Sequence, residues 1–129
     1  MPDKPAFEDF GEVLLRSDKA AGYVRVDWFT PEALPTWGDG RLTILGTEGY
    51  IELRKYIDIA GRPGKDHLFL VNGKEMTHID CSGEKLDYFD AFTADVGNRT
   101  QTAMTQDHVF EVCRLSLEAQ TKAARIGAR

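Results

Sequence analysis

Several features that would assign a function at once are missing from this sequence. Among 129 residues there are two cysteines, Cys81 and Cys113, which are too few for a disulfide framework. No apolar run approaches the roughly 18 residues of a membrane span, and no apolar stretch typical of a secretory signal follows Met1. The net charge of −5 is not typical of proteins that bind nucleic acid or anionic lipid. We therefore expect a cytoplasmic protein with reduced thiols, and neither nucleic acid nor membrane as a partner.

The common motifs of catalysis and cofactor binding are missing as well. The sequence has no nucleophile elbow, no phosphate loop and no Gly-x-Gly-x-x-Gly after a predicted strand. His78, Asp80 and Cys81 are side-chain types that bind metals, but alternation along a strand turns Cys81 away from the other two. No nearby Cys or His pair completes four ligands. We therefore expect no catalytic residue, no metal and no cofactor in this chain.

What is present is the composition of a folded domain. Hydrophobic residues make up 42% of the chain, aromatic residues 10% and charged residues 29%, which are ordinary proportions for a globular domain. A chain of 129 residues has the size of one domain and can bury a core without disulfides or metal.

Hydrophobic periodicity places strands before helices. Six strands are predicted, at residues 12–17, 23–29, 41–45, 50–58, 67–71 and 75–81, followed by helices over about 86–96 and from Thr105 or Asp107 to about Ile126. Asn72-Gly73 predicts a type I′ turn between the last two strands. This order predicts an α+β fold, with an open, mostly antiparallel sheet of about six strands and two helices on one face.

The two faces of the predicted sheet differ in chemistry. One face is aliphatic and suits the helices: Val24, Val26, Ile51, Leu53 and Ile57. The other face combines aromatic and charged side chains, as protein interfaces do, and we expect the chain to associate with itself through it. The residues of this predicted interface are Tyr23, Arg25, Tyr50, Glu52, Arg54 and Tyr56. A solvated sheet face is the alternative.

A glycine-rich loop carries the most suggestive polar residues. Trp37, Asp39 and Arg41 bring an indole, a carboxylate and a guanidinium into one short segment. Stacking on an aromatic ring, combined with charged hydrogen bonds, is a common way to hold a sugar-like polyol. We interpret these residues as substrate-binding and add His108, which could face a cleft from the start of the last helix. The alternative is a rigid loop with a buried tryptophan.

Three longer segments and one shorter segment resemble a known family. They are residues 22–31, 36–41 and 44–56, and Asn98-Arg99-Thr100 with the closing helix through residues 118–120. Together they resemble the C-terminal domain of Gfo/Idh/MocA-type oxidoreductases, over about Phe7 to Ile126. The run ILGTEGYIE at residues 44–52 is the most specific part of this resemblance.

The resemblance implies a role in a larger enzyme. Members of that family bind NAD(P) in an N-terminal Rossmann domain, whereas the C-terminal domain contributes to the substrate site and the oligomer interface. Their substrates are sugars, inositol or similar polyols. The family's glycine fingerprint, its Glu-Lys-Pro stretch with the catalytic lysine and its Asp-x-x-x-His stretch have no counterpart here.

We therefore expect residues 1–129 to be the C-terminal substrate-binding and oligomerisation domain of such an enzyme, inactive alone. NAD or NADP is implied only for the full-length protein. The expected partners are a second copy of the chain and the missing Rossmann domain. The alternative is a freestanding interaction module that associates through its open sheet face.

Overall fold

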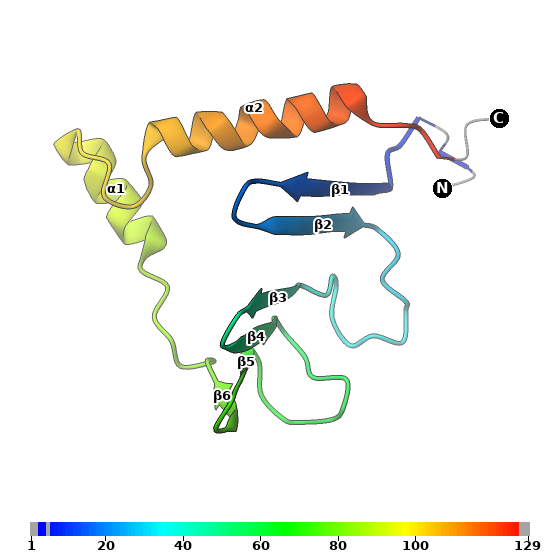
Figure 1. The fold of residues 1–129 in the computed structure, drawn as a ribbon, viewed down its shortest axis with the longest axis vertical. Helices are drawn as coiled ribbons and strands as arrows, with labels where there is room; N and C mark the ends of the chain where they lie inside the picture. The colour runs from blue at the N-terminus through cyan, green and yellow to red at the C-terminus, as the bar shows by residue number, and fades with distance from the viewer. Residues whose placement is uncertain (1–2, 5, 127–129) are drawn as a thin grey trace. The chain divides into compact units, whose positions relative to one another are not determined.

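The structure, a computed structural model, describes residues 3–4 and 6–126. The chain divides into two compact units, Met1–Glu84 and Lys85–Arg129. The first unit contains the strands and the second contains two helices (Figure 1). The predicted α+β class, with six antiparallel strands and two helices, is confirmed. The predicted position of the helices on one sheet face stays a prediction.

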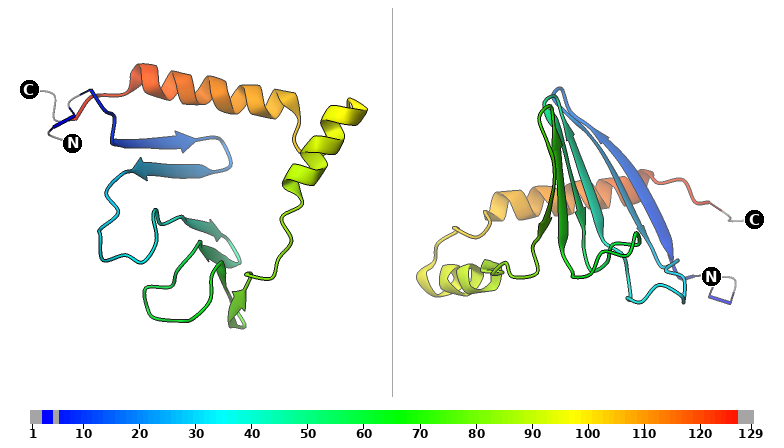
Figure 2. Two further views of the ribbon diagram at one scale, coloured as in Figure 1. Left: turned by 180° about the vertical axis from the view of Figure 1, so that it is seen from behind. Right: turned by 90° about the horizontal axis from the view of Figure 1, so that it is seen from below.

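The six strands form two antiparallel sheets within the first unit (Figure 2). The two-stranded sheet consists of β1 (Phe10–Arg16) and β2 (Ala21–Asp27). The four-stranded sheet has the order β3-β4-β5-β6, with β3 at Arg41–Gly46, β4 at Gly49–Arg54, β5 at His67–Asn72 and β6 at Met76–Asp80. Consecutive strands are neighbours in each sheet, as expected for hairpin connections.

The hairpin between β5 and β6 forms where predicted, but the predicted turn type is wrong. A type I′ turn at Asn72-Gly73 needs a positive φ at both residues, and neither has one. Instead, the Asn72 side chain accepts hydrogen bonds from the backbone N–H groups of Lys74 and Glu75, at 2.8 and 3.1 Å. This turn replaces the type I′ turn because an asparagine side chain readily accepts a hydrogen bond from the backbone N–H two residues later.

β4 is shorter than the predicted strand at 50–58. It ends at Arg54, and Tyr56 has a φ of 83°, which an extended strand cannot contain. Ile57 therefore does not continue the aliphatic face of Ile51 and Leu53, as the alternation predicted.

The second unit contains α1 (Tyr88–Asn98) and α2 (Gln106–Lys122). α1 extends through Gly97 and Asn98, beyond the end near residue 96 that the sequence predicted, and Arg99 follows it in the left-handed conformation. The Thr105 side chain caps α2, as the sequence allowed, by accepting from the His108 N–H at 3.3 Å. Within the described residues, neither helix is long and apolar enough to cross a membrane.

Among the described residues of the two units, no apolar side chain is buried. The buried described residues are all polar: Asp58, His67 and Asp95. Val24 and Val26 of the predicted aliphatic face are exposed on β2. The core expected from length and composition is therefore absent from each unit taken by itself.

Candidate functional site

The structure brings Asp39 and Arg41 together at the start of β3. Arg41 Nε donates to Asp39 Oδ2 at 2.9 Å, and Arg41 Nη2 lies 2.8 Å from the same oxygen. Gly38 precedes the pair with a φ of 79°, a conformation that glycine adopts without steric cost. Lys55 N–H donates to the Gly40 carbonyl at 2.8 Å, which fixes the loop against the residue after β4.

Trp37 is exposed beside this ion pair. Its side chain is 80% exposed, so the alternative of a buried tryptophan is wrong. The Trp37 ring meets Trp28 edge to face at 5.5 Å, and Trp28 meets Phe7 in the same way at 5.6 Å. Sequence reasoning missed Trp28 and Phe7 as neighbours of Trp37, because their contact depends on how the loop at 28–40 folds back. The same short segment of chain thus carries an accessible aromatic surface and a preformed carboxylate–guanidinium pair.

His108 lies in the second unit, in the first turn of α2. Its backbone N–H caps the helix through Thr105. A shared site with Trp37 stays a prediction.

The residues of the predicted self-association face are divided between the two sheets. Tyr23 and Arg25 lie on β2, whereas Tyr50, Glu52 and Arg54 lie on β4. Tyr56 lies beyond the end of β4, with the Lys55 Nζ 4.9 Å from the centroid of its ring. The interface itself stays a prediction.

Tyr23 and Arg25 are tied to neighbours in the two-stranded sheet. The Tyr23 hydroxyl donates to Glu12 Oε2 at 2.7 Å, which raises the Tyr23 pKa because the neighbouring carboxylate disfavours ionisation. Arg25 Nε donates to Asp27 Oδ2 at 2.8 Å, and the Arg25 guanidinium lies 5.3 Å from the centroid of the Phe10 ring.

Strand β4 carries a second charged cluster, which includes Asp58 in the following loop. Arg54 donates to Glu52 and to Asp58 Oδ1, each at 2.6 Å, and lies 5.0 Å from the centroid of the Phe69 ring on β5. Asp58 also accepts from the Ala60 N–H at 2.9 Å. That backbone bond and Arg54 lower the pKa of Asp58, in that order of effect, and keep its carboxylate ionised. Alternation along a strand could not reveal Asp58, since the loop after β4 positions it.

A pair of histidines lies on the same sheet face. His67 Nδ1 on β5 is 2.9 Å from His78 Nε2 on β6. The strand register opposes Phe69 to His78, so His67 and His78 are diagonal neighbours. This register, taken from the β5–β6 hairpin, is the signal by which sequence reasoning could have found the pair.

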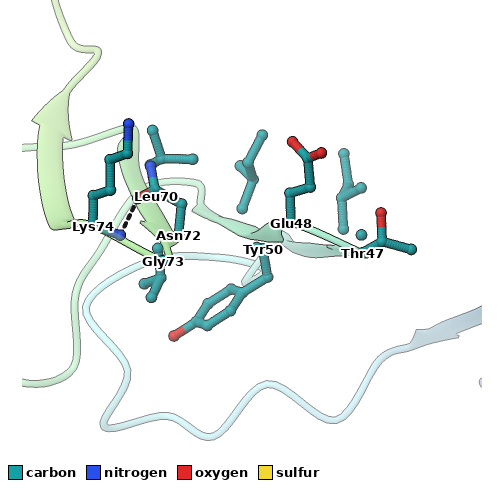
Figure 3. A pocket seen from close by; sticks show the side chains of 12 residues that line it. Thr47, Glu48, Tyr50, Leu70, Asn72, Gly73 and Lys74 are labelled. Atoms are coloured by element: carbon teal, nitrogen blue, oxygen red, sulfur yellow. Dashed lines mark hydrogen bonds between the residues drawn. The ribbon is translucent and has the colours of Figure 1, made fainter.

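A groove opens at the end of the four-stranded sheet that carries the β3–β4 and β5–β6 turns (Figure 3). Its volume is about 840 Å³, and its lining includes Thr47, Glu48, Gly73 and Lys74. The Glu48 and Lys74 side chains extend to one side of the sheet and the Tyr50 ring to the other (Figure 3). The groove is wide and carries no converging set of polar groups.

The glycine-rich turns among the described residues lack the connection to a helix that a nicotinamide cofactor needs. Binding of its pyrophosphate needs a glycine-rich turn that leads from a strand into a helix. The glycine-rich turns at 38–40 and 46–49 lead into strands β3 and β4. The residue before α1 is Asp87, an acid, which is unfavourable for a phosphate.

The three residues of metal-binding type, His78, Asp80 and Cys81, do not form a common site. His78 pairs with His67, Asp80 accepts from the Ser82 N–H at 2.9 Å, and the Cys81 thiol is a free thiol. Across residues 3–4 and 6–126, no group of three or more His, Cys, Asp or Glu side chains could hold a metal ion.

Comparison with known proteins finds a similarity to a solved structure. No family model matches the chain, and no curated protein matches it. The chain is similar to a protein from Erwinia carotovora atroseptica SCRI1043, described as a "putative oxidoreductase", whose crystal structure was determined at 1.25 Å. The identity is 48% and the TM-score 0.90, and the match covers 98% of this chain and 38% of that protein's chain. Nearly all of this chain is therefore similar to one part of a longer protein described as an oxidoreductase.

Proposed function

We propose that this chain is the substrate-binding and oligomerisation domain of an NAD(P)-dependent oxidoreductase of the Gfo/Idh/MocA type. The observation that carries the proposal is the match to a described oxidoreductase at 48% identity over 98% of this chain. The match covers only 38% of the longer chain, so the remainder is free to supply the Rossmann domain. This chain alone is inactive and binds no nicotinamide, since it has no phosphate-binding turn.

In this proposal, Trp37, Asp39 and Arg41 bind a sugar, inositol or similar polyol. The exposed indole provides an apolar platform. Asp39 accepts from hydroxyl groups, and the unused Arg41 donors bind hydroxyl oxygens. Their ion pair holds both side chains in place before the substrate arrives, which lowers the ordering cost of binding.

Association with other protein surfaces follows from the lack of a core. In the described part of each unit no apolar side chain is buried, and large residues such as Leu42, Ile44 and Phe110 are exposed. Apolar surface of this extent is typical of proteins that pack against partners. We propose two partners, the Rossmann domain and a second copy of this chain. We also propose a cytoplasmic location, which the free thiols of Cys81 and Cys113 support.

The test uses the full-length protein, in which this chain would be joined to the proposed Rossmann domain. An upstream reading frame with a Rossmann fingerprint is expected, and a stop codon directly before Met1 would instead favour a freestanding interaction module. Turnover of a panel of monosaccharides and inositols with NAD+ or NADP+ is then measured for Asp39→Ala and Arg41→Ala. Loss of one charged hydrogen bond should lower kcat/KM about ten- to a hundredfold.

The matched control is Arg16→Ala, since Arg16 is an exposed arginine on β1. This variant should leave kcat/KM unchanged, and all three variants should retain cofactor affinity. Equal activity of Arg41→Ala and Arg16→Ala contradicts the substrate role of the loop.

A further inference from the structure

A cavity lies between two loops of the first unit. One loop precedes β3 and the other follows β4. The volume is about 440 Å³, and the lining includes Leu34, Pro35, Ile57, Asp58, Ile59 and Arg62. This volume falls within the range of small-molecule sites, which combine apolar walls with a few polar groups.

One carboxylate oxygen in this cavity lacks a hydrogen bond. The Asp58 side chain is 2% exposed, and its Oδ1 accepts from Arg54 and from the Ala60 N–H. Among the described residues, Oδ2 contacts the Arg62 Nε at 3.6 Å, which is too long for a hydrogen bond. No hydrogen bond of the described residues uses Oδ2, so this oxygen is an acceptor available to a ligand.

The other charged group of the cavity, the Arg62 guanidinium, is half exposed and makes only a long contact with Asp58. The Arg62 side chain is 50% exposed, and its guanidinium lies 5.5 Å from the centroid of the Phe69 ring. Its contact with Asp58 is loose, so most of its five donors are not used there. Arg62 can therefore turn toward an anionic group that enters the cavity.

The two charges together restrict the chemistry of a ligand. A cation would approach Arg62 at close range, and a simple anion would approach the Asp58 carboxylate. A ligand that satisfies both has an anionic group for Arg62 and a neutral donor, such as a hydroxyl, for Asp58 Oδ2. Its carbon skeleton would lie against Leu34, Pro35 and Ile57.

We propose that this cavity is a binding site for a small hydroxylated anion, of which a sugar acid is the simplest type. The anionic group pairs with Arg62 and a neighbouring hydroxyl donates to Asp58 Oδ2. The site uses neither Trp37 nor Arg41 and needs no turnover, so it stands independently of the proposed oxidoreductase role.

Titration calorimetry on the intact protein tests this site with three probes. Glucuronate carries both groups, glucose lacks the anion, and acetate lacks the hydroxyls. Glucuronate should bind at least about tenfold more tightly than either of the others, since only it makes both charged hydrogen bonds. Equal binding of glucuronate and glucose overturns the proposal.

Two variants locate the binding. Arg62→Gln should weaken glucuronate binding about tenfold or more, whereas Arg16→Gln, the same change on exposed β1, should not. Ala33→Trp fills the rim of the cavity without removing Asp58, whose loss would endanger the loop, and should abolish binding. If Arg41→Gln weakens glucuronate binding and Arg62→Gln does not, the ligand occupies the proposed substrate loop and this inference is wrong. Absence of enzyme activity leaves the calorimetric result intact and counts only against the proposed function.

Discussion

His67 and His78 are joined by a hydrogen bond of 2.9 Å between adjacent strands. His67 is completely buried, and its Nε2 has no hydrogen-bond partner in the described part of the chain. The replacement His78→Phe keeps an aromatic ring beside Phe69 but leaves both His67 nitrogens unpaired. We expect it to lower the free energy of unfolding of the intact protein by about 1–3 kcal/mol, the cost of an unsatisfied buried polar group. Urea denaturation measures this change.

Two further variants separate this effect from a general loss of packing. The double replacement of His67 and His78 by Phe removes both polar partners, and such a swap is often nearly neutral. It should therefore recover most of the stability lost in His78→Phe. His108→Phe replaces a histidine on exposed α2 and should change stability little. A double variant no more stable than His78→Phe argues against this account.

Gly49 leaves no room for a side chain between β4 and the backbone of β5. A Cβ atom at Gly49 would lie 2.2 Å from the Val71 carbonyl oxygen. That oxygen belongs to the strand paired with Gly49 and cannot retreat without disturbing the register. We expect Gly49→Ala to lower the free energy of unfolding by about 1–3 kcal/mol or more, as overpacking does.

Gly22→Ala is the matched control for this change. Gly22 lies in β2 with a negative φ, and a Cβ atom there would meet no atom within 4 Å. Its replacement should be neutral or slightly stabilising, because glycine within a strand carries an entropic cost. Thermal unfolding of both variants is the measurement, and equal midpoints contradict the close approach at Gly49.

Asp95 holds the turn between the two helices. Its carboxylate accepts hydrogen bonds from the hydroxyls of Thr100 and Thr102 and from the N–H groups of Thr102 and Ala103, at 2.6 to 2.9 Å. The Thr100 hydroxyl and these backbone groups lower the pKa of Asp95 far below its usual range. The ionised form therefore stabilises the fold above the unfolded-state pKa of about 3.9. This stabilisation is lost as pH falls below that value.

Asp95→Asn should destabilise the protein at neutral pH, because its amide NH₂ cannot accept hydrogen bonds. The difference in unfolding midpoint between the parent and Asp95→Asn should narrow as pH falls below about 4, because the unfolded parent then takes up a proton that the folded carboxylate resists. Asp87→Asn is the control, because the Asp87 side chain is exposed and makes no capping hydrogen bond. A pH-independent difference contradicts the role of the Asp95 charge.

The sequence predicted the elements better than their ends. Alternating side-chain types located β2 and β4, an apolar run located β1, and the Asn72-Gly73 signal located β5 and β6. The end of β4 was missed because the positive φ of Tyr56 arises from the loop that follows. Similarly, asparagine is common both in type I′ turns and in turns closed by its own side chain, so the sequence did not decide which of the two follows β5.

The candidate site was predictable only where its members are close in sequence. Asp39 and Arg41 lie two residues apart, so their pairing follows from local geometry. Asp58, in contrast, meets Arg54 and Arg62 through the folded loop after β4, and lies near Pro35 across a cavity. Contacts of that kind depend on loop conformation, which periodicity does not encode.

The proposed self-association surface on β4 gives a direct prediction about assembly. In a two-fold contact the same residues of both copies meet, so one substitution acts twice. Tyr50→Asp adds a carboxylate to a face that already carries the Glu52–Arg54 ion pair, and its counterpart on the second copy would repel it. We expect the intact protein to sediment as a dimer or larger at tens of micromolar, and Tyr50→Asp to shift it to the monomer.

The matched control for Tyr50→Asp is Tyr88→Asp, the same change at the first residue of α1. An aspartate at that position is compatible with the helix dipole, so the fold should be retained. Tyr88→Asp should leave the sedimentation coefficient of the assembly unchanged. A monomeric parent protein rejects self-association altogether, whereas dissociation by both variants shows that the surface on β4 is not specific. If the protein associates through the β4 surface, Tyr50→Asp alone should dissociate the assembly, and its circular dichroism spectrum should be unchanged.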